Sequence, residues 1–130
     1  RAMEGSRGLG DVYKRQLDRA YSALIDDLSD RGMLDDTLLI AMGEFGRTPK
    51  ISNRAAREHH KDCYFSIWAG GGIEPGRVIG ESDAKAEHPI TRPITPLQVG
   101  TTIAELCGIG ARKRAEMKVL DGGSVIHELI

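Results

Sequence analysis

A glycine-bracketed turn early in the chain carries one acidic and one basic side chain. Residues 43–49 read Gly-Glu-Phe-Gly-Arg-Thr-Pro and directly follow the apolar run of residues 37–42. The two glycines let the backbone bend sharply or approach a ligand closely, and the Thr-Pro pair turns the chain away from any helix. Because α/β proteins bind ligands at the carboxyl ends of their strands, Glu44 and Arg47 are candidates for an anion site or a metal site.

Two imidazoles follow this turn, since residues 57–60 read Arg-Glu-His-His. If Glu44 and His59 meet in space, they offer an oxygen and a nitrogen ligand to a divalent cation such as zinc, which accepts both. The metal would polarise a sulfate or phosphate ester and lower the pKa of a bound nucleophile. Arg47 would then hold the ester oxygens as a planar fork of donors. The alternative is that Glu44 and Arg47 pair with each other and only fix the loop.

The neighbours of His59 have two interpretations. Arg57 and Glu58 either orient His59 through hydrogen bonds in a second layer around the site or are solvated loop charges. His60 is expected to face solvent or to make a loop hydrogen bond. The remaining histidines, His88 and His127, have no convincing cluster around them and are expected to be structural.

The two cysteines are expected to be small buried apolar side chains and not a disulfide. Cys63 begins an apolar run and Cys107 ends an expected helix. Nucleophilic catalysis by Cys63 is not expected, because only the nearby Lys61 could lower the pKa of its thiol.

Length and composition limit the classes of function. The chain has 130 residues, which is enough for one small domain. Its 18 Lys and Arg residues balance 19 Asp and Glu residues, so the net charge of -1 gives no overall field that would attract nucleic acid. The basic run of residues 112–114 has no aromatic neighbours for base stacking and is expected to be a solvated turn. No stretch approaches the roughly 20 apolar residues of a membrane span.

The periodicity of the sequence predicts an α/β fold. Leu17, Tyr21, Leu24, Ile25 and Leu28 recur at helical spacing, and Gly32 ends this helix. Continuous apolar residues predict a strand over 37–42 that is buried on both faces. Together these elements form half of a βαβ unit.

The rest of the chain is assigned by the same signals. We expect a functional loop over 43–62, a strand over 63–69, a turn at 70–72, an edge strand over 77–80, a polar loop over 81–92, a helix from Thr95-Pro96 to Gly108 that buries Val99, Ile103 and Leu106, and a final apolar segment over 125–130.

Residues 1–16 are left out of this assignment. Residues 6–16 have neither helical nor strand periodicity, and they resemble the translated adapter remnant that recurs at the ends of reading frames from metagenome assemblies. The alternative is a natural flexible basic tail. The expected organisation is therefore a non-native or disordered tail over 1–16 and one domain over 17–130.

The order of the pieces over residues 17–130 resembles the C-terminal part of the alkaline phosphatase and sulfatase superfamily. The matching pieces are the strand that ends in the turn 43–46, the strand and Pro-Gly turn of 68–76, the helix from 95 to 109, and the Asp-Gly-Gly-Ser segment of 121–124. The resemblance implies the C-terminal part of a sulfatase-like sheet that helices flank.

More narrowly, residues 43–49 together with Arg-Glu-His at 57–59 resemble the uncharacterised, sulfatase-like bacterial family called domain of unknown function 1501. This resemblance implies a hydrolase of sulfate or phosphate esters with Arg47 as a catalytic residue. It also implies Glu44 and His59 as ligands of zinc, calcium or manganese, and an exported or periplasmic location. The alternative is a non-catalytic exported protein for binding or surface assembly on the same fold.

The sequence departs from the superfamily pattern in one place. Glu44-Phe45 stands where the superfamily enzymes place Asp-His as two metal ligands, so one ligand becomes longer and the other becomes an apolar ring. The superfamily's nucleophile and its first metal-binding aspartate lie N-terminal to all of the matching pieces. We therefore expect the chain to be inactive alone, and the sequence indicates no oligomeric state.

Overall fold

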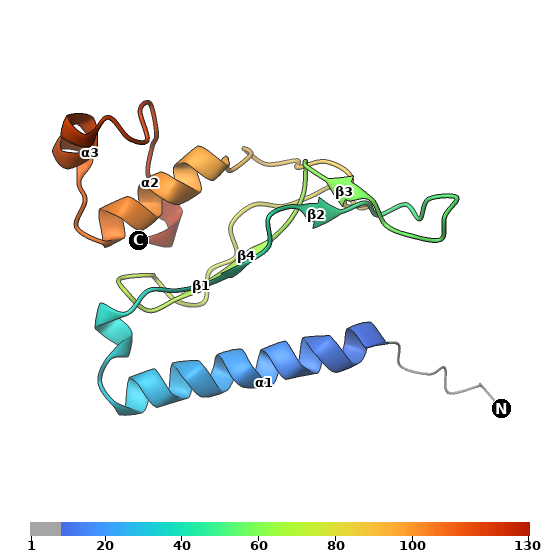
Figure 1. Cartoon of the computed structure of the whole chain (residues 1–130), viewed down its shortest axis with the longest axis horizontal. Coiled ribbons are helices and arrows are strands. Elements are labelled where there is room, and N and C mark those ends of the chain that lie inside the picture. Colours follow the sequence, from blue (N-terminus) through green and yellow to red (C-terminus); the bar gives the residue numbers. More distant parts are fainter. Residues whose placement is uncertain (1–8) are drawn as a thin grey trace.

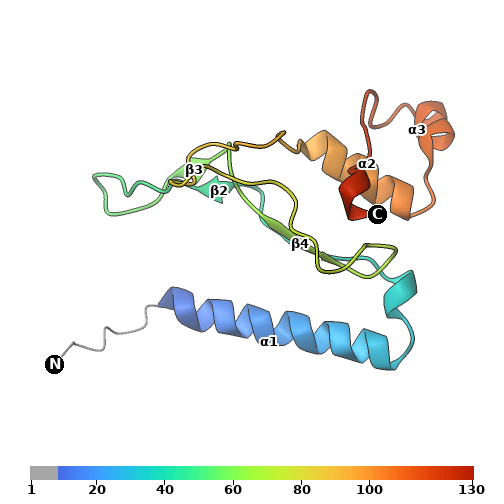
Figure 2. The same ribbon diagram turned by 180° about the vertical axis from the view of Figure 1, so that it is seen from behind.

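Residues 9–130, which the computed structural model describes, form three α-helices and two small antiparallel sheets. A two-stranded ribbon lies between the long helix α1 and the helix α2 in both views (Figures 1 and 2). The chain is mixed α/β, as predicted. The elements are α1 Leu9–Asp30, the 3-10 helix η1 Leu34–Asp36, β1 Leu39–Met42, β2 Gly46–Arg47, β3 His59–His60, β4 Ser66–Ala69, α2 Pro96–Leu106, α3 Ala111–Met117 and the 3-10 helix η2 His127–Leu129.

Helix α1 confirms the first predicted helix and begins earlier than its apolar periodicity. Leu28 is buried, and the Tyr21 hydroxyl donates a hydrogen bond to the backbone oxygen of Leu39 at 3.3 Å, which ties the helix to the ribbon. Gly32 ends the helix with φ +66, a conformation that glycine adopts without strain.

Helix α1 extends into the segment that was expected to be a tail. Residues 9–16 are helical, and the side chains of residues 13–20 are all exposed. Extending an existing helix adds one hydrogen bond for each ordered residue, so a helix can continue without apolar periodicity or packing. Residues 1–8 of the expected tail lie outside the described residues.

The predicted buried strand exists, but its pairing is different from the one expected. β1 pairs antiparallel with β4, with Leu39 opposite Ala69 and Met42 opposite Ser66. The prediction of a strand buried on both faces was wrong, because Leu39 is only half-buried and Met42 is 46% exposed. The connection between the strands contains no helix, so the chain returns as a hairpin and not through the crossover that parallel strands require.

The glycine turn after β4 lies against the segment before β1. Gly70 and Gly71 both have positive φ, and a Cβ at Gly70 would lie 2.3 Å from the backbone oxygen of Thr37. The prediction of an edge strand over 77–80 was wrong, because these residues form no strand. Only a single bridge, from Ser82 to Pro89, forms after them in the described residues.

Helix α2 confirms the predicted start. The Thr95 hydroxyl accepts a hydrogen bond from the Gln98 backbone, and the Gln98 side chain accepts one from the Thr95 backbone, which completes a capping box. The predicted apolar burial was wrong, because the buried side chains of α2 are Gln98, Thr101 and Thr102.

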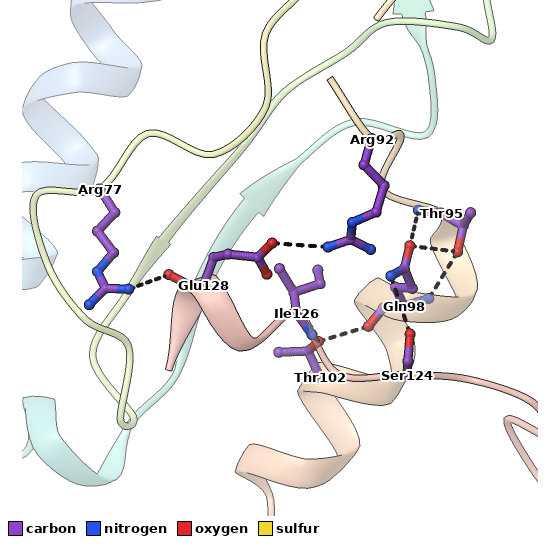
Figure 3. A network of polar contacts seen from close by, with 8 residues as sticks. All are labelled: Arg77, Arg92, Thr95, Gln98, Thr102, Ser124, Ile126 and Glu128. Atoms are coloured by element: carbon purple, nitrogen blue, oxygen red, sulfur yellow. Dashed lines mark hydrogen bonds and ion pairs between the residues drawn. The ribbon is translucent and has the colours of Figure 1, made fainter. Parts of the chain in front are cut away.

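The C-terminal segment explains this polar burial. Thr102 Oγ1 accepts a hydrogen bond from the Ile126 backbone at 2.9 Å, and Gln98 Nε2 donates one to Ser124 Oγ at 3.3 Å (Figure 3). Because buried polar groups need partners, the polar face of α2 fixes the segment in place. Ile126 is 1% exposed and is, with Leu28, one of two buried apolar side chains in the described chain.

The basic run of residues 112–114 is helical and not the solvated turn that was predicted. Arg114 in α3 is 7% exposed, and its guanidinium donates to Glu105 Oε2 at 2.5 Å and to the Ile109 oxygen at 2.7 Å. This ion pair joins α3 to α2. A charged group is buried here because two acceptors compensate the loss of hydration.

The two cysteines differ in exposure, since Cys63 is half-buried and Cys107 is exposed. Cys63 and Cys107 are free thiols, and Cys107 is exposed, contrary to its predicted burial, because it caps the exposed end of α2. Within residues 9–130, no helix combines the length and the apolar character that crossing a membrane would require.

Candidate functional site

The turn at 43–49 and the histidines at 59–60 form one hairpin, which we call the site hairpin (residues 43–60). β2 and β3 pair antiparallel, with Gly46 opposite His60 and Arg47 opposite His59. Side chains of directly opposite residues lie on the same face of an antiparallel pair. The chain therefore brings a guanidinium and an imidazole to one face, directly beyond the end of β1.

Phe45 joins these two side chains. Its ring stacks on the His59 imidazole with the ring centroids 3.7 Å apart and the planes at 29°. The Arg47 guanidinium carbon lies 5.2 Å from the centroid of the same phenyl ring, which is within the range of a cation–π contact. Arg47 and His59 are exposed, whereas Phe45 is half-buried.

Hydrogen bonds to backbone oxygens close the loop end of the site hairpin, next to β2 and β3. Arg57 Nη1 donates to the Thr48 oxygen at 2.6 Å and also to the Pro49 oxygen, and Arg47 Nη1 donates to the Arg57 oxygen at 3.3 Å. Thr48 Oγ1 accepts from the Glu58 backbone at 3.1 Å. Arg57 thus fixes the segment opposite the strand that carries His59. The role of Arg57 and Glu58 as orienting partners of the imidazole stays a prediction.

Gly46 lets the site hairpin lie against the irregular segment that leads into β4. A Cβ at this position would lie 1.9 Å from the backbone oxygen of Cys63 and 3.2 Å from that of His60. No side chain fits at such a distance. The glycine is therefore required for close backbone approach and not for an unusual φ angle.

Glu44 is exposed on the bend before β2. Among the described residues its carboxylate makes no hydrogen bond and no ion pair, so the alternative in which Glu44 pairs with Arg47 does not occur. Arg47 instead contacts Phe45 and the Arg57 oxygen.

A metal centre would need more ligands than the described residues supply. Glu44 and His59 are an oxygen and a nitrogen donor, but zinc sites in proteins use three or four protein ligands. No group of three or more His, Cys, Asp or Glu side chains within residues 9–130 is arranged to hold a metal ion. Glu44 and His59 as metal ligands remain a prediction.

The side of the site hairpin next to β4 is acidic. His60 Nε2 lies 3.0 Å from the Glu87 oxygen, which agrees with the predicted loop hydrogen bond. A hydrogen bond from Lys61 lowers the pKa of Asp62.

Burial raises the pKa of the Cys63 thiol, and the carboxylates of Asp83 and Asp62 raise this pKa further. The thiol form of Cys63 is favoured, so Cys63 is unsuited to be a nucleophile.

A cleft of about 440 Å³ lies elsewhere in the molecule and carries two arginines. Arg77 pairs with Glu74 at 2.6 Å. Arg92 pairs with Glu128 at 3.0 Å (Figure 3). The cleft therefore has no surplus positive charge. Arg47 and His59 have no acidic partner in the described chain, which makes the site hairpin the better candidate for binding an anion.

Sequence reasoning missed the role of Phe45, which it treated only as a departure from a metal-binding pattern. A usable signal was present. Residues two apart on a strand share a face, so Phe45 and Arg47 lie together once residues 45–47 are extended. The stacking on His59 depends on the β2–β3 register, which no local signal specifies.

The chain was compared with known families, curated proteins and solved structures. Residues 5–130 match the family described as "Protein of unknown function (DUF1501)". No curated protein and no solved structure is significantly similar to the chain.

Proposed function

We propose, from the premise that this chain belongs to the DUF1501 family, that its site hairpin binds the tetrahedral oxyanion of a sulfate or phosphate ester. The observation that carries the proposal is the register of β2 and β3, which sets Arg47 directly opposite His59. Both side chains are exposed, and neither has an acidic partner within residues 9–130.

The chemistry of the two groups suits an oxyanion. A guanidinium presents planar N–H donors that match the oxygens of a sulfate or phosphate group. Only Nη1 of Arg47 is used by a hydrogen bond in the described chain, so donors at Nε and Nη2 remain for a ligand. The imidazole adds a further N–H donor and, when protonated, a second positive charge.

The wider setting that we propose is a sulfatase- or phosphatase-like hydrolase of the alkaline phosphatase superfamily. In this setting Arg47 holds the ester oxygens of the substrate. The described residues supply no nucleophile that we can assign, since burial raises the pKa of the Cys63 thiol. The proposal therefore gives the site hairpin the task of binding and orienting the ester.

Replacing Arg47 by glutamine tests the binding proposal. A hydrogen bond to a charged group contributes about 1.5–3 kcal/mol, so we expect Arg47→Gln to weaken the binding of inorganic phosphate and sulfate roughly 10- to 100-fold. The measurement is an NMR titration of the 130-residue chain at constant ionic strength. Arg54→Gln is the matched control, because it removes the same charge from the exposed loop of the site hairpin and should change the affinity less than about twofold. Equal losses in the two variants would contradict a specific site.

A non-catalytic binding protein is the second candidate. The type of residue at position 45 favours this candidate, because the apolar ring of Phe45 stands where the superfamily enzymes place a second metal ligand.

Hydrolysis by a longer family member that carries the same seven-residue string separates the two candidates. The enzyme proposal predicts turnover of an aryl sulfate or aryl phosphate, and at least a 100-fold loss on changing the position of Glu44 to glutamine. Phosphate binding without turnover would identify a binding protein. Turnover that Glu44→Gln leaves unchanged would remove Glu44 from the mechanism.

A further inference from the structure

Phe45 contacts both Arg47 and His59, the two exposed side chains of the proposed site. Its ring is stacked on the His59 imidazole at 3.7 Å, and the guanidinium of Arg47 lies 5.2 Å from its centroid. Arg47 and His59 are paired residues of β2 and β3, Phe45 directly precedes β2, and Phe45 is the only half-buried member of the three.

A guanidinium and a protonated imidazole need such a contact if they are to stay side by side. Like charges directly opposite each other on paired strands repel, and Arg47 meets this repulsion whenever His59 is protonated. The face of a phenyl ring carries the negative part of its quadrupole and attracts both a guanidinium and an imidazolium. The Phe45 ring therefore offsets the repulsion between the groups.

Stacking also leaves the hydrogen-bonding atoms of both groups available. The nitrogen atoms of an imidazole lie at the edge of the ring and point outward in its plane, so a stacked partner covers the face but not these donors. The hydrogen bond from Arg47 Nη1 to the Arg57 oxygen fixes one side of the guanidinium. The other donors of Arg47 and the edge of His59 can then be aimed at one ligand.

We propose that Phe45 is a positioning residue, which holds Arg47 and His59 at the separation that one phosphate or sulfate group spans. The inference rests on the proposed oxyanion site and adds the residue that assembles it. Phe45 touches no reacting atom in this account. It acts through the two side chains that it contacts.

Phe45→Leu and Phe45→Tyr in the 130-residue chain test this role. Leucine keeps the apolar bulk but removes the aromatic face, whereas tyrosine keeps the face. Each exposed cation–π or stacking contact changes an equilibrium a few-fold. We expect Phe45→Leu to weaken the binding of inorganic phosphate about 5- to 20-fold and Phe45→Tyr to stay within about twofold of the unchanged chain.

The second readout is the NMR resonances of the His59 ring protons. A stacked phenyl ring shifts these resonances upfield. Phe45→Leu should therefore move them downfield, whereas in Phe45→Tyr they should stay close to their positions in the unchanged chain. Retained β2–β3 amide shifts in Phe45→Leu would show that the hairpin is intact while the side chains are released.

The outcomes separate this inference from the proposed function. Phosphate binding in Phe45→Leu that equals the binding in the unchanged chain would overturn the positioning role and leave the oxyanion site standing. No phosphate or sulfate binding by the unchanged chain would overturn both. Weaker binding in Phe45→Leu, with recovery in Phe45→Tyr and the matching His59 shifts, would support the positioning role.

Discussion

Gly46→Ala is expected to weaken oxyanion binding by the chain strongly. The new Cβ would lie 1.9 Å from the backbone oxygen of Cys63, and this neighbour is backbone, which cannot rotate away as a flexible side chain would. Overpacking of this kind costs about 1–3 kcal/mol or more. Relief requires the backbone at Gly46 to move away from Cys63 and from the His60 oxygen, which would lie at 3.2 Å, and we expect this movement to disturb the β2–β3 pairing that sets Arg47 opposite His59. Phosphate affinity should fall more than 10-fold, and the stacked resonances of the His59 ring should be lost.

Gly43→Ala is the matched control for this prediction. A Cβ at Gly43 would meet only the Phe45 oxygen, at 3.6 Å, which is an ordinary van der Waals contact. Phosphate titrations of the two variants, followed by NMR, should therefore separate them clearly. A Gly46→Ala chain that binds phosphate as tightly as the Gly43→Ala chain would contradict the proposed geometry of the site hairpin.

Ile126→Ala should produce the largest loss of stability. Ile126 is 1% exposed, and its backbone N–H donates to the buried Thr102 hydroxyl. Removing a fully buried isoleucine side chain costs about 2–5 kcal/mol, which is a large part of the total stability of a small domain. Because only Leu28 accompanies Ile126 as a buried apolar side chain in the described chain, few other contacts can compensate.

Urea unfolding followed by circular dichroism measures this loss. Ile51→Ala is the control, since Ile51 is 59% exposed and its truncation should change the free energy of unfolding by less than about 0.5 kcal/mol. Similar unfolding midpoints for the two variants would show that the C-terminal segment does not pack against α2 as described.

The elements that could be predicted from the sequence are those with strong local signals. Thr95 and Pro96 mark the start of α2 by capping chemistry that operates within four residues. Gly32 likewise marks the end of α1. The family could be recognised because residues 43–49 and 57–59 form a specific string, and the match over residues 5–130 confirms it.

The parts that could not be predicted depend on contacts between distant residues. The apolar run of β1 does not specify whether its neighbour is parallel or antiparallel, and the return of the chain as a hairpin decides this. Burial of Thr102 depends on the segment that carries Ile126, and burial of Arg114 depends on Glu105. The partners of β1 and of Thr102 lie outside the window over which periodicity is read, and Arg114 and Glu105, although nine residues apart, lie in two different helices.

The candidate site was predicted in part. The sequence indicated Arg47 and His59, and the β2–β3 register brings them together. It also indicated Glu44, whose carboxylate has no partner in the described residues. Phe45 contacts both Arg47 and His59, and its contact with His59 depends on the pairing of β2 with β3.

The most direct test of the central claim is a titration of the isotope-labelled chain with inorganic phosphate, followed at the Arg47 Nε–H and at the His59 ring protons. If one oxyanion bridges the two groups, both signals shift along saturating curves with a single dissociation constant. Shifts at only one of the two side chains, or linear shifts without saturation, would contradict a shared site.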